Sequence, residues 1–84
     1  MLKFRKTTPI EAVQFRGGGY IFRRALTEFA GDDVMFRQDR EMRVHTREGW
    51  TEWLPLGYWV ATDGVSFWPI ADDFMQANYE EVEP

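Results

Sequence analysis

The hydrophobic residues near the start of the chain predict a strand that is interrupted by a proline. Residues 2–15 read LKFRKTTPIEAVQF, and apolar and polar side chains alternate there in two pieces on either side of Pro9. Alternation with a period of two is typical of a strand, and proline cannot donate a hydrogen bond to a ladder. We therefore expect an edge strand that is broken at Thr8 and Pro9. A glycine-rich break follows at residues 16–19.

Between residues 20 and 31 the period changes to that of an amphipathic helix. Apolar side chains recur at spacings i, i+1, i+4, i+5 and i+8, which form one stripe on a helix. The stripe consists of Ile21, Phe22, Ala25, Leu26 and Phe29. Gly31 follows at the position where glycine commonly ends a helix. This is the one clear amphipathic helix that the pattern predicts.

The remainder of the chain has a β pattern with turn signals between short apolar runs. Residues 42–46 alternate, with Met42, Val44 and Thr46 on one side of the predicted strand. Gly49 lies in a short hairpin loop, and Asp63-Gly64 is a two-residue hairpin signal. Residues 71–82 open as a short helical turn and then extend. The predicted fold class is α+β, an antiparallel meander of about five or six strands with one helix packed on it, forming a single domain over residues 1–84.

Composition narrows the class of protein. The chain has 84 residues, of which 44% are hydrophobic and 17% aromatic, enough for a folded core. It contains no cysteine, which excludes disulfides and thiolate metal sites. No apolar run reaches the roughly 18 residues that a membrane span needs, and the first residues lack the apolar segment of a secretory signal. We expect a cytoplasmic protein without a membrane association.

The charges are distributed unevenly along the chain. All ten Lys and Arg residues lie within residues 1–47, together with six acids, whereas residues 48–84 carry eight acids and no Lys or Arg. Such asymmetry is a hint of a charged partner, but it also arises when the two halves of a small antiparallel fold interleave. A sequence pI near 4.9 argues against nucleic-acid binding, which depends on attraction to phosphate.

No catalytic or metal-binding constellation stands out. His45 is the only histidine and Ser66 the only serine, and Ser66 lacks the glycines of a nucleophile elbow. The pairs Asp32-Asp33 and Asp72-Asp73 lack the spacing of a calcium loop. We therefore predict that the protein is not an enzyme, and we expect no catalytic residue, cofactor or metal.

The tryptophans are the candidate functional residues. All four lie within nineteen residues of the chain, and one helix covers only one face of a small sheet. Either the sheet encloses both faces or some indoles remain exposed as an interface. The predicted partner-binding residues are Trp50, Trp53, Trp59 and Trp68, with Glu48 and Glu52 as an acidic rim.

Several ordered motifs resemble a family of small proteins from phages and prophages, most of which have no assigned function. The matching segments are LKFRKTTPIEAVQF at 2–15, HTREG at 45–49, GYWVATDGVSFWPI at 57–70 and DDFMQANYEEV at 72–82. The sequence departs from the family at Tyr58, where the family usually has Asp. The resemblance implies a phage-related origin, a bacterial host and a small β-rich fold, and it implies no catalytic residues.

Together these features predict a non-catalytic interaction protein that binds a protein partner or itself as a homo-oligomer. One form of this hypothesis is an inhibitor of a host defence or nucleic-acid-handling protein that acts through its acidic half. The alternative is a small-ligand module with an aromatic-lined pocket between helix and sheet, in which Arg23, Arg24 or Arg43 holds an anion. An uncharacterised enzyme is the third hypothesis.

Overall fold

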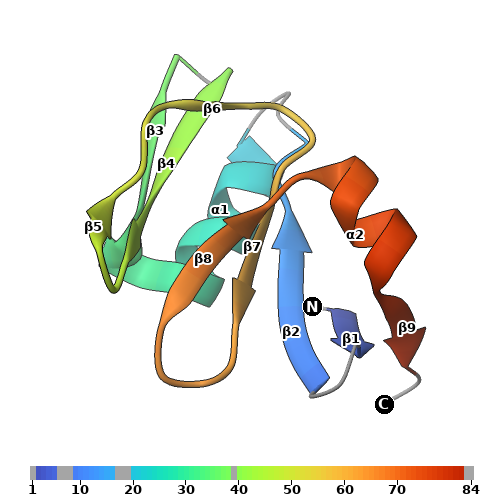
Figure 1. Ribbon diagram of the computed structural model, residues 1–84. Coiled ribbons are helices and arrows are strands. Elements are labelled where there is room, and N and C mark those ends of the chain that lie inside the picture. Colours follow the sequence, from blue (N-terminus) through green and yellow to red (C-terminus); the bar gives the residue numbers. More distant parts are fainter. Residues whose placement is uncertain (1, 6–8, 17–19, 39, 83–84) are drawn as a thin grey trace.

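The computed structural model of the protein describes residues 2–5, 9–16, 20–38 and 40–82. In these residues the chain forms an α+β fold with two antiparallel sheets, which confirms the predicted class (Figure 1). The first sheet has the strand order β8 (Phe67–Ile70), β7 (Trp59–Thr62), β2 (Pro9–Gln14), β1 (Leu2–Arg5) and β9 (Glu80–Val82). The second sheet contains β3 (Val34–Arg37), β4 (Glu41–Thr46) and β5 (Gly49–Trp50), with β6 (Leu54–Pro55) also paired to β4. The helices are α1 (Tyr20–Ala30), the 3₁₀ turn η1 (Gly31–Asp33) and α2 (Asp72–Asn78).

The first sheet differs from the expected meander because its central pairs join distant parts of the chain. β2 pairs with β7, and β1 pairs with β9, so that Arg5 lies opposite Glu80 in the register. The predicted edge strand is in fact a hairpin: β1 and β2 run antiparallel, with Pro9 at the first position of β2. β2 is a central strand, because β1 and β7 pair with it on either side. Proline is compatible with this position because it is tolerated at the start of a strand. Of the predicted break at residues 16–19, residues 17–19 lie outside the described residues.

The two faces of the first sheet pack against different layers. On one face, Phe15 and Val60 join Leu26 of α1 and Met42 of β4 in a fully buried core. Figure 1 shows α2 on the other side of this sheet from α1. There a second core forms around Met75 of α2, and its members are Ile10, Ala12, Trp59, Ala61, Ile70 and Met75. The side chains on both faces of β7 are consequently buried, as expected for a strand that is covered by a helix on each side.

The helix and turn predictions are confirmed in most details. α1 ends at Ala30, and Gly31 has a φ of +58°, a conformation that glycine adopts without steric cost. The final segment forms α2 and then β9, as the predicted turn and extension require. The β7–β8 loop is longer than predicted, because Thr62 and Phe67 are the last paired residues. The Asp63 side chain caps this loop by accepting hydrogen bonds from backbone N–H groups of the loop.

Candidate functional site

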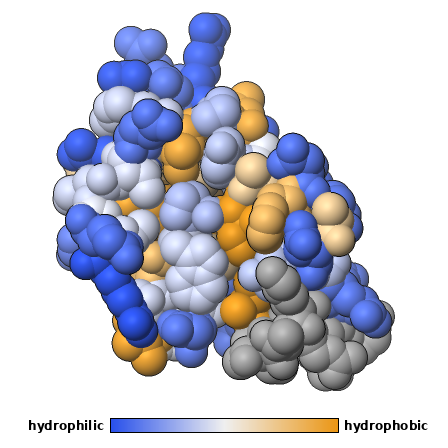
Figure 2. All heavy atoms as spheres, in the orientation of Figure 1, coloured by the Kyte–Doolittle hydropathy of each residue, from blue (hydrophilic) through white to orange (hydrophobic). Residues whose placement is uncertain are grey.

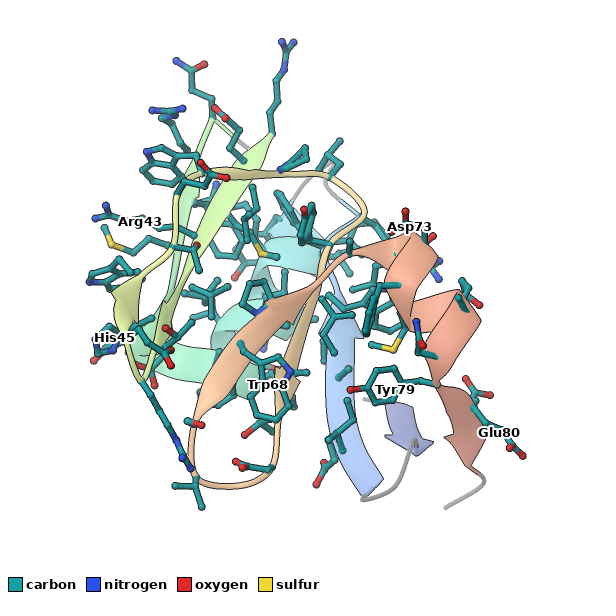
Figure 3. All side chains as sticks on the ribbon, viewed as in Figure 1. Arg43, His45, Trp68, Asp73, Tyr79 and Glu80 are labelled. Atoms are coloured by element: carbon teal, nitrogen blue, oxygen red, sulfur yellow. The ribbon has the colours of Figure 1, made fainter. Side chains whose placement is uncertain are left out.

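The outer face of the second sheet carries a row of aromatic and cationic side chains that are exposed or half-buried. Alternation along β4 buries Met42 and Val44 and turns Arg43 and His45 outward. Trp50 lies directly opposite His45 in the register. Leu54 pairs with the buried Met42, so the preceding residue, Trp53, projects to the outer face beside Arg43. Figure 3 shows Arg43 and His45 extending from β4 on the side away from α2.

These side chains stack on one another in alternating order. The Arg43 guanidinium carbon lies 4.8 Å from the ring centroid of Trp50 and 5.0 Å from that of Trp53. At one end, the Arg37 guanidinium lies 4.5 Å from the Trp53 centroid. At the other end, the His45 and Trp50 rings are 5.1 Å apart and tilted by 38°. These distances are within the range of cation–π and aromatic contacts. We call this row, Arg37, Trp53, Arg43, Trp50 and His45, the indole–arginine stack.

Arg43 is electrostatically unlike the other two polar members of the stack. Arg37 pairs with Glu41 at 2.7 Å, and His45 Nδ1 lies 3.1 Å from Asp33 Oδ1. Within the described residues, Arg43 has no carboxylate partner, and its Nη2 instead lies 3.4 Å from the Met35 sulfur. Its Nε is buried without a hydrogen-bond acceptor. Arg43 is thus a positive charge that lies between two indoles and forms no ion pair among the described residues.

The structure places the predicted partner-binding residues in three different environments. Trp50 is 41% exposed and Trp53 is half-buried, and both belong to the stack. Glu48 and Glu52 are exposed, although the charges in contact with the indoles are those of arginines rather than of this acidic rim. Trp68 is half-buried on β8, beside the second core and apart from the stack (Figure 3). Figure 2 shows hydrophobic side chains at the surface between hydrophilic ones where β8 meets α2.

Trp59 is a correction to the predicted surface, because it is only 4% exposed and belongs to the second core. Its indole Nε1 donates a 2.9 Å hydrogen bond to Asp72 Oδ1 at the start of α2. Gln14 and Gln76 donate to the same oxygen. The Trp59 bond, followed by the Gln76 bond, holds the pKa of Asp72 below its ordinary value. Trp59 therefore joins α2 to the sheet within one chain, and it is not available to a partner.

A groove between α1 and the first sheet matches the location of the pocket in the alternative hypothesis. The cationic residues named for it do not line it: Arg24 pairs with Glu28 at 3.0 Å, Arg23 lies over the Phe36 ring, and Arg43 belongs to the stack. Arg16, which the sequence patterns did not single out, lines this groove together with Gln14. The alternation of apolar and polar residues does not mark Arg16, because this residue lies just beyond the end of β2. Its position depends on the pairing of β2 with β7.

The alternation in β4 was the one signal in the sequence that could have revealed the stack. It placed Arg43 and His45 on one side of the strand, and Trp50 follows the turn that returns along that side. Arg37 and Met35 on β3 carried no comparable signal, since their position depends on the pairing of Arg37 with Glu41 and of Met35 with Arg43.

Comparison with known proteins yields no relative: no protein family model, no curated protein and no solved structure matches this chain. Among the described residues, no helix is long and apolar enough to cross a membrane. The same residues contain no group of three or more His, Asp or Glu side chains that could hold a metal ion. The function of the protein is therefore inferred from the stack and the groove.

Proposed function

We propose that the protein is a non-catalytic interaction protein, of phage or prophage origin, that acts in the cytoplasm of a bacterial host. It binds an acidic, aromatic-containing segment of a partner protein through the indole–arginine stack. The single observation that carries this proposal is the state of Arg43, a guanidinium held between two indoles without a carboxylate partner among the described residues.

The residue types of the stack are those that dominate protein interfaces. Tryptophan and arginine are enriched among the residues whose truncation costs the most binding energy. Here the side chains are already ordered by mutual stacking, so association costs less side-chain entropy than it would for free arginines. Met35, 43% exposed and in contact with Arg43, adds an adaptable apolar surface beside the stack.

The charge of Arg43 favours an acidic partner over a second copy of the chain. A two-fold interface would place Arg43 of one copy near the same residue of the other, and like charges there are repulsive. Asp73 and Glu80 lie on the opposite side of the molecule from Arg43 (Figure 3). A contact between these two sides would join copies head to tail and generate open chains rather than a closed oligomer.

The distribution of the acidic residues supports an inhibitor that mimics a nucleic acid less well than it supports binding through the indole–arginine stack. Such mimicry needs carboxylates clustered on one surface. Asp73 and Glu80 lie on the α2 and β9 side, whereas Glu48 lies in the turn between β4 and β5 (Figures 1 and 3). Asp63 uses its carboxylate to cap the β7–β8 loop, and hydrogen bonds from that loop hold its pKa below the ordinary value.

A displayed library of random peptides tests the proposal even though the partner is unidentified. We expect the selected peptides to combine Asp or Glu with aromatic or large apolar residues. Binding of a selected peptide should fall at least tenfold in Trp50→Ala and in Arg43→Met, because each removes a central contact of the stack. Arg40→Met is the matched control, since it removes the same charge from an exposed position outside the stack.

Three outcomes would contradict the proposal. The first is selection of peptides without an acidic bias, and the second is equal loss of binding in the Arg40 control. The third is tighter binding of oligothymidylate than of any selected peptide, with the same dependence on Trp50, because indoles and arginines also bind single-stranded nucleic acid. Sedimentation equilibrium of the free protein tests the predicted homo-oligomer separately, and dissociation by Arg43→Met would assign the face to self-association instead.

A further inference from the structure

We propose that the groove between α1 and the first sheet binds a small carboxylate that has a flat apolar body. The site lies on different elements from the indole–arginine stack and does not depend on the function proposed for it. The groove has a volume of about 410 Å³, within the usual range for small-molecule sites.

The groove exists because α1 packs on the sheet only through its second half. Leu26 and Ala30 are buried, at 0% and 5% exposure, whereas Ile21 and Phe22 are 77% and 38% exposed. The predicted apolar stripe is therefore covered at one end and uncovered at the other. A helix that diverges from a sheet in this way leaves a wedge-shaped space with apolar walls.

The walls of this wedge are mostly apolar. One wall is the face of α1 formed by residues at i, i+3 and i+7, and the other is formed by β2 and β7. Phe22, Ala25 and Phe29 line the groove from the helix and Val13 lines it from β2, whereas the side chains of Ala12 and Trp59, which also border the groove, belong to the second core. The small Ala25 side chain leaves the space open where a larger side chain would fill it, and the rings of Phe22 and Phe29 favour a flat apolar ligand.

Arg16 supplies the polar end of the site. Its Nε donates to Gln14 Oε1 at 3.1 Å. Gln14 is itself fixed, because its Nε2 donates to the Gly57 carbonyl at 3.1 Å and to Asp72 Oδ1 at 3.2 Å. The guanidinium is thus anchored through one nitrogen. No carboxylate forms an ion pair with Arg16 among the described residues, so its terminal nitrogens can take an anion in a bidentate contact.

The balance of charge selects a monoanion over a phosphate. Glu28 also lines the groove, but Arg24 neutralises it by donating to Oε1 at 3.0 Å. Asp72 lies close enough to interact with Arg16 electrostatically. A dianion would face both carboxylates with a single guanidinium as its donor, whereas a carboxylate matches the one available cation.

A two-dimensional ¹H–¹⁵N NMR titration with 2-naphthoate, and with 2-naphthamide as its neutral analogue, tests this site. We expect 2-naphthoate to shift the Val13 and Ala25 amide resonances and to leave the Trp50 indole unchanged. Arg16→Gln should weaken 2-naphthoate about tenfold, the loss of one charge-assisted contact, and leave 2-naphthamide unaffected. Arg40→Gln, which removes an exposed arginine away from the groove, should change neither.

A second variant separates loss of the site from loss of the fold. Ala25 is exposed on α1, so Ala25→Phe fills the groove without disturbing the buried core, and it should abolish binding at an unchanged melting temperature. The proposal is overturned if the acid and the amide bind equally, if neither binds at millimolar concentration, or if Ala25→Phe retains binding. It is also overturned if only a partner peptide, and no small carboxylate, shifts the groove resonances.

Discussion

Replacing Arg43 with methionine separates a role in binding from a role in stability. Methionine keeps an unbranched apolar side chain between the two indoles while removing the charge and all hydrogen-bond donors. If the indole–arginine stack serves binding, this substitution should abolish partner recognition and leave the fold intact.

The expected change in unfolding free energy follows from two opposed contributions. Arg43 contacts the rings of Trp50 and Trp53, and each cation–π contact near the surface stabilises by about 0.5–1 kcal/mol. Against this, the Arg43 Nε is covered without an acceptor, and a buried unsatisfied donor costs about 1–3 kcal/mol. These contributions oppose each other, so Arg43→Met should destabilise the protein by no more than about 1 kcal/mol.

Urea unfolding followed by far-ultraviolet circular dichroism measures this change. Tryptophan fluorescence is unsuitable, because two of the four indoles contact the substituted residue. Met42→Ala is the matched control, since Met42 precedes Arg43 on β4 and is 0% exposed on the opposite face. It should cost about 2–5 kcal/mol.

A loss of more than about 3 kcal/mol in Arg43→Met would refute this reasoning. It would mean that the stack holds the second sheet together, since removing one partner of a buried network is the usual origin of so large an effect. The free charge of Arg43 would then no longer point to a partner.

Three further predictions concern the fold. Leu26→Ala should destabilise the protein by about 2–5 kcal/mol, whereas Ile21→Ala on the same helix should stay within about 0.5 kcal/mol, and equal effects in urea unfolding would contradict the partial packing of α1. The pKa of Asp63 is lower in the folded state than in the unfolded state, so its contribution to stability is present above the unfolded pKa and is lost as the pH falls through the folded value. Asp63→Asn should therefore flatten the dependence of melting temperature on pH below about pH 4. An unchanged slope would refute this prediction. Trp59→Phe should cost about 1–2 kcal/mol and raise the Asp72 pKa, because it removes the largest cause of the shift, and a carboxyl titration by NMR that shows no rise would contradict that cause.

The local signals in the sequence predicted local structure well. The apolar stripe and Gly31 predicted α1 and its end, and the turn signals near residues 47–49 and 63–64 marked the two hairpins. Each of these features depends on the period of the side chains or on the φ of one glycine, which neighbouring residues determine. The same signals failed at Pro9, where a break within one strand and a reversal between two strands look alike in sequence.

The functional surfaces depended on contacts between distant residues. The side chains of β7 on the Trp59 face are apolar enough for an interface, and only the packing of α2, with Asp72 accepting a hydrogen bond from the indole, shows that this face is interior. Trp50 and Trp53 are the same residue type as Trp59, but Trp50 is exposed and Trp53 half-buried, and both rings contact Arg43 on the outer face of β4. The pattern of the chain thus determined the α+β class, the helix and the short strands, since these follow from local periodicity. Tertiary structure decided which indoles are buried and placed Arg16 at the end of a groove, because burial depends on pairing and packing between segments far apart in the chain.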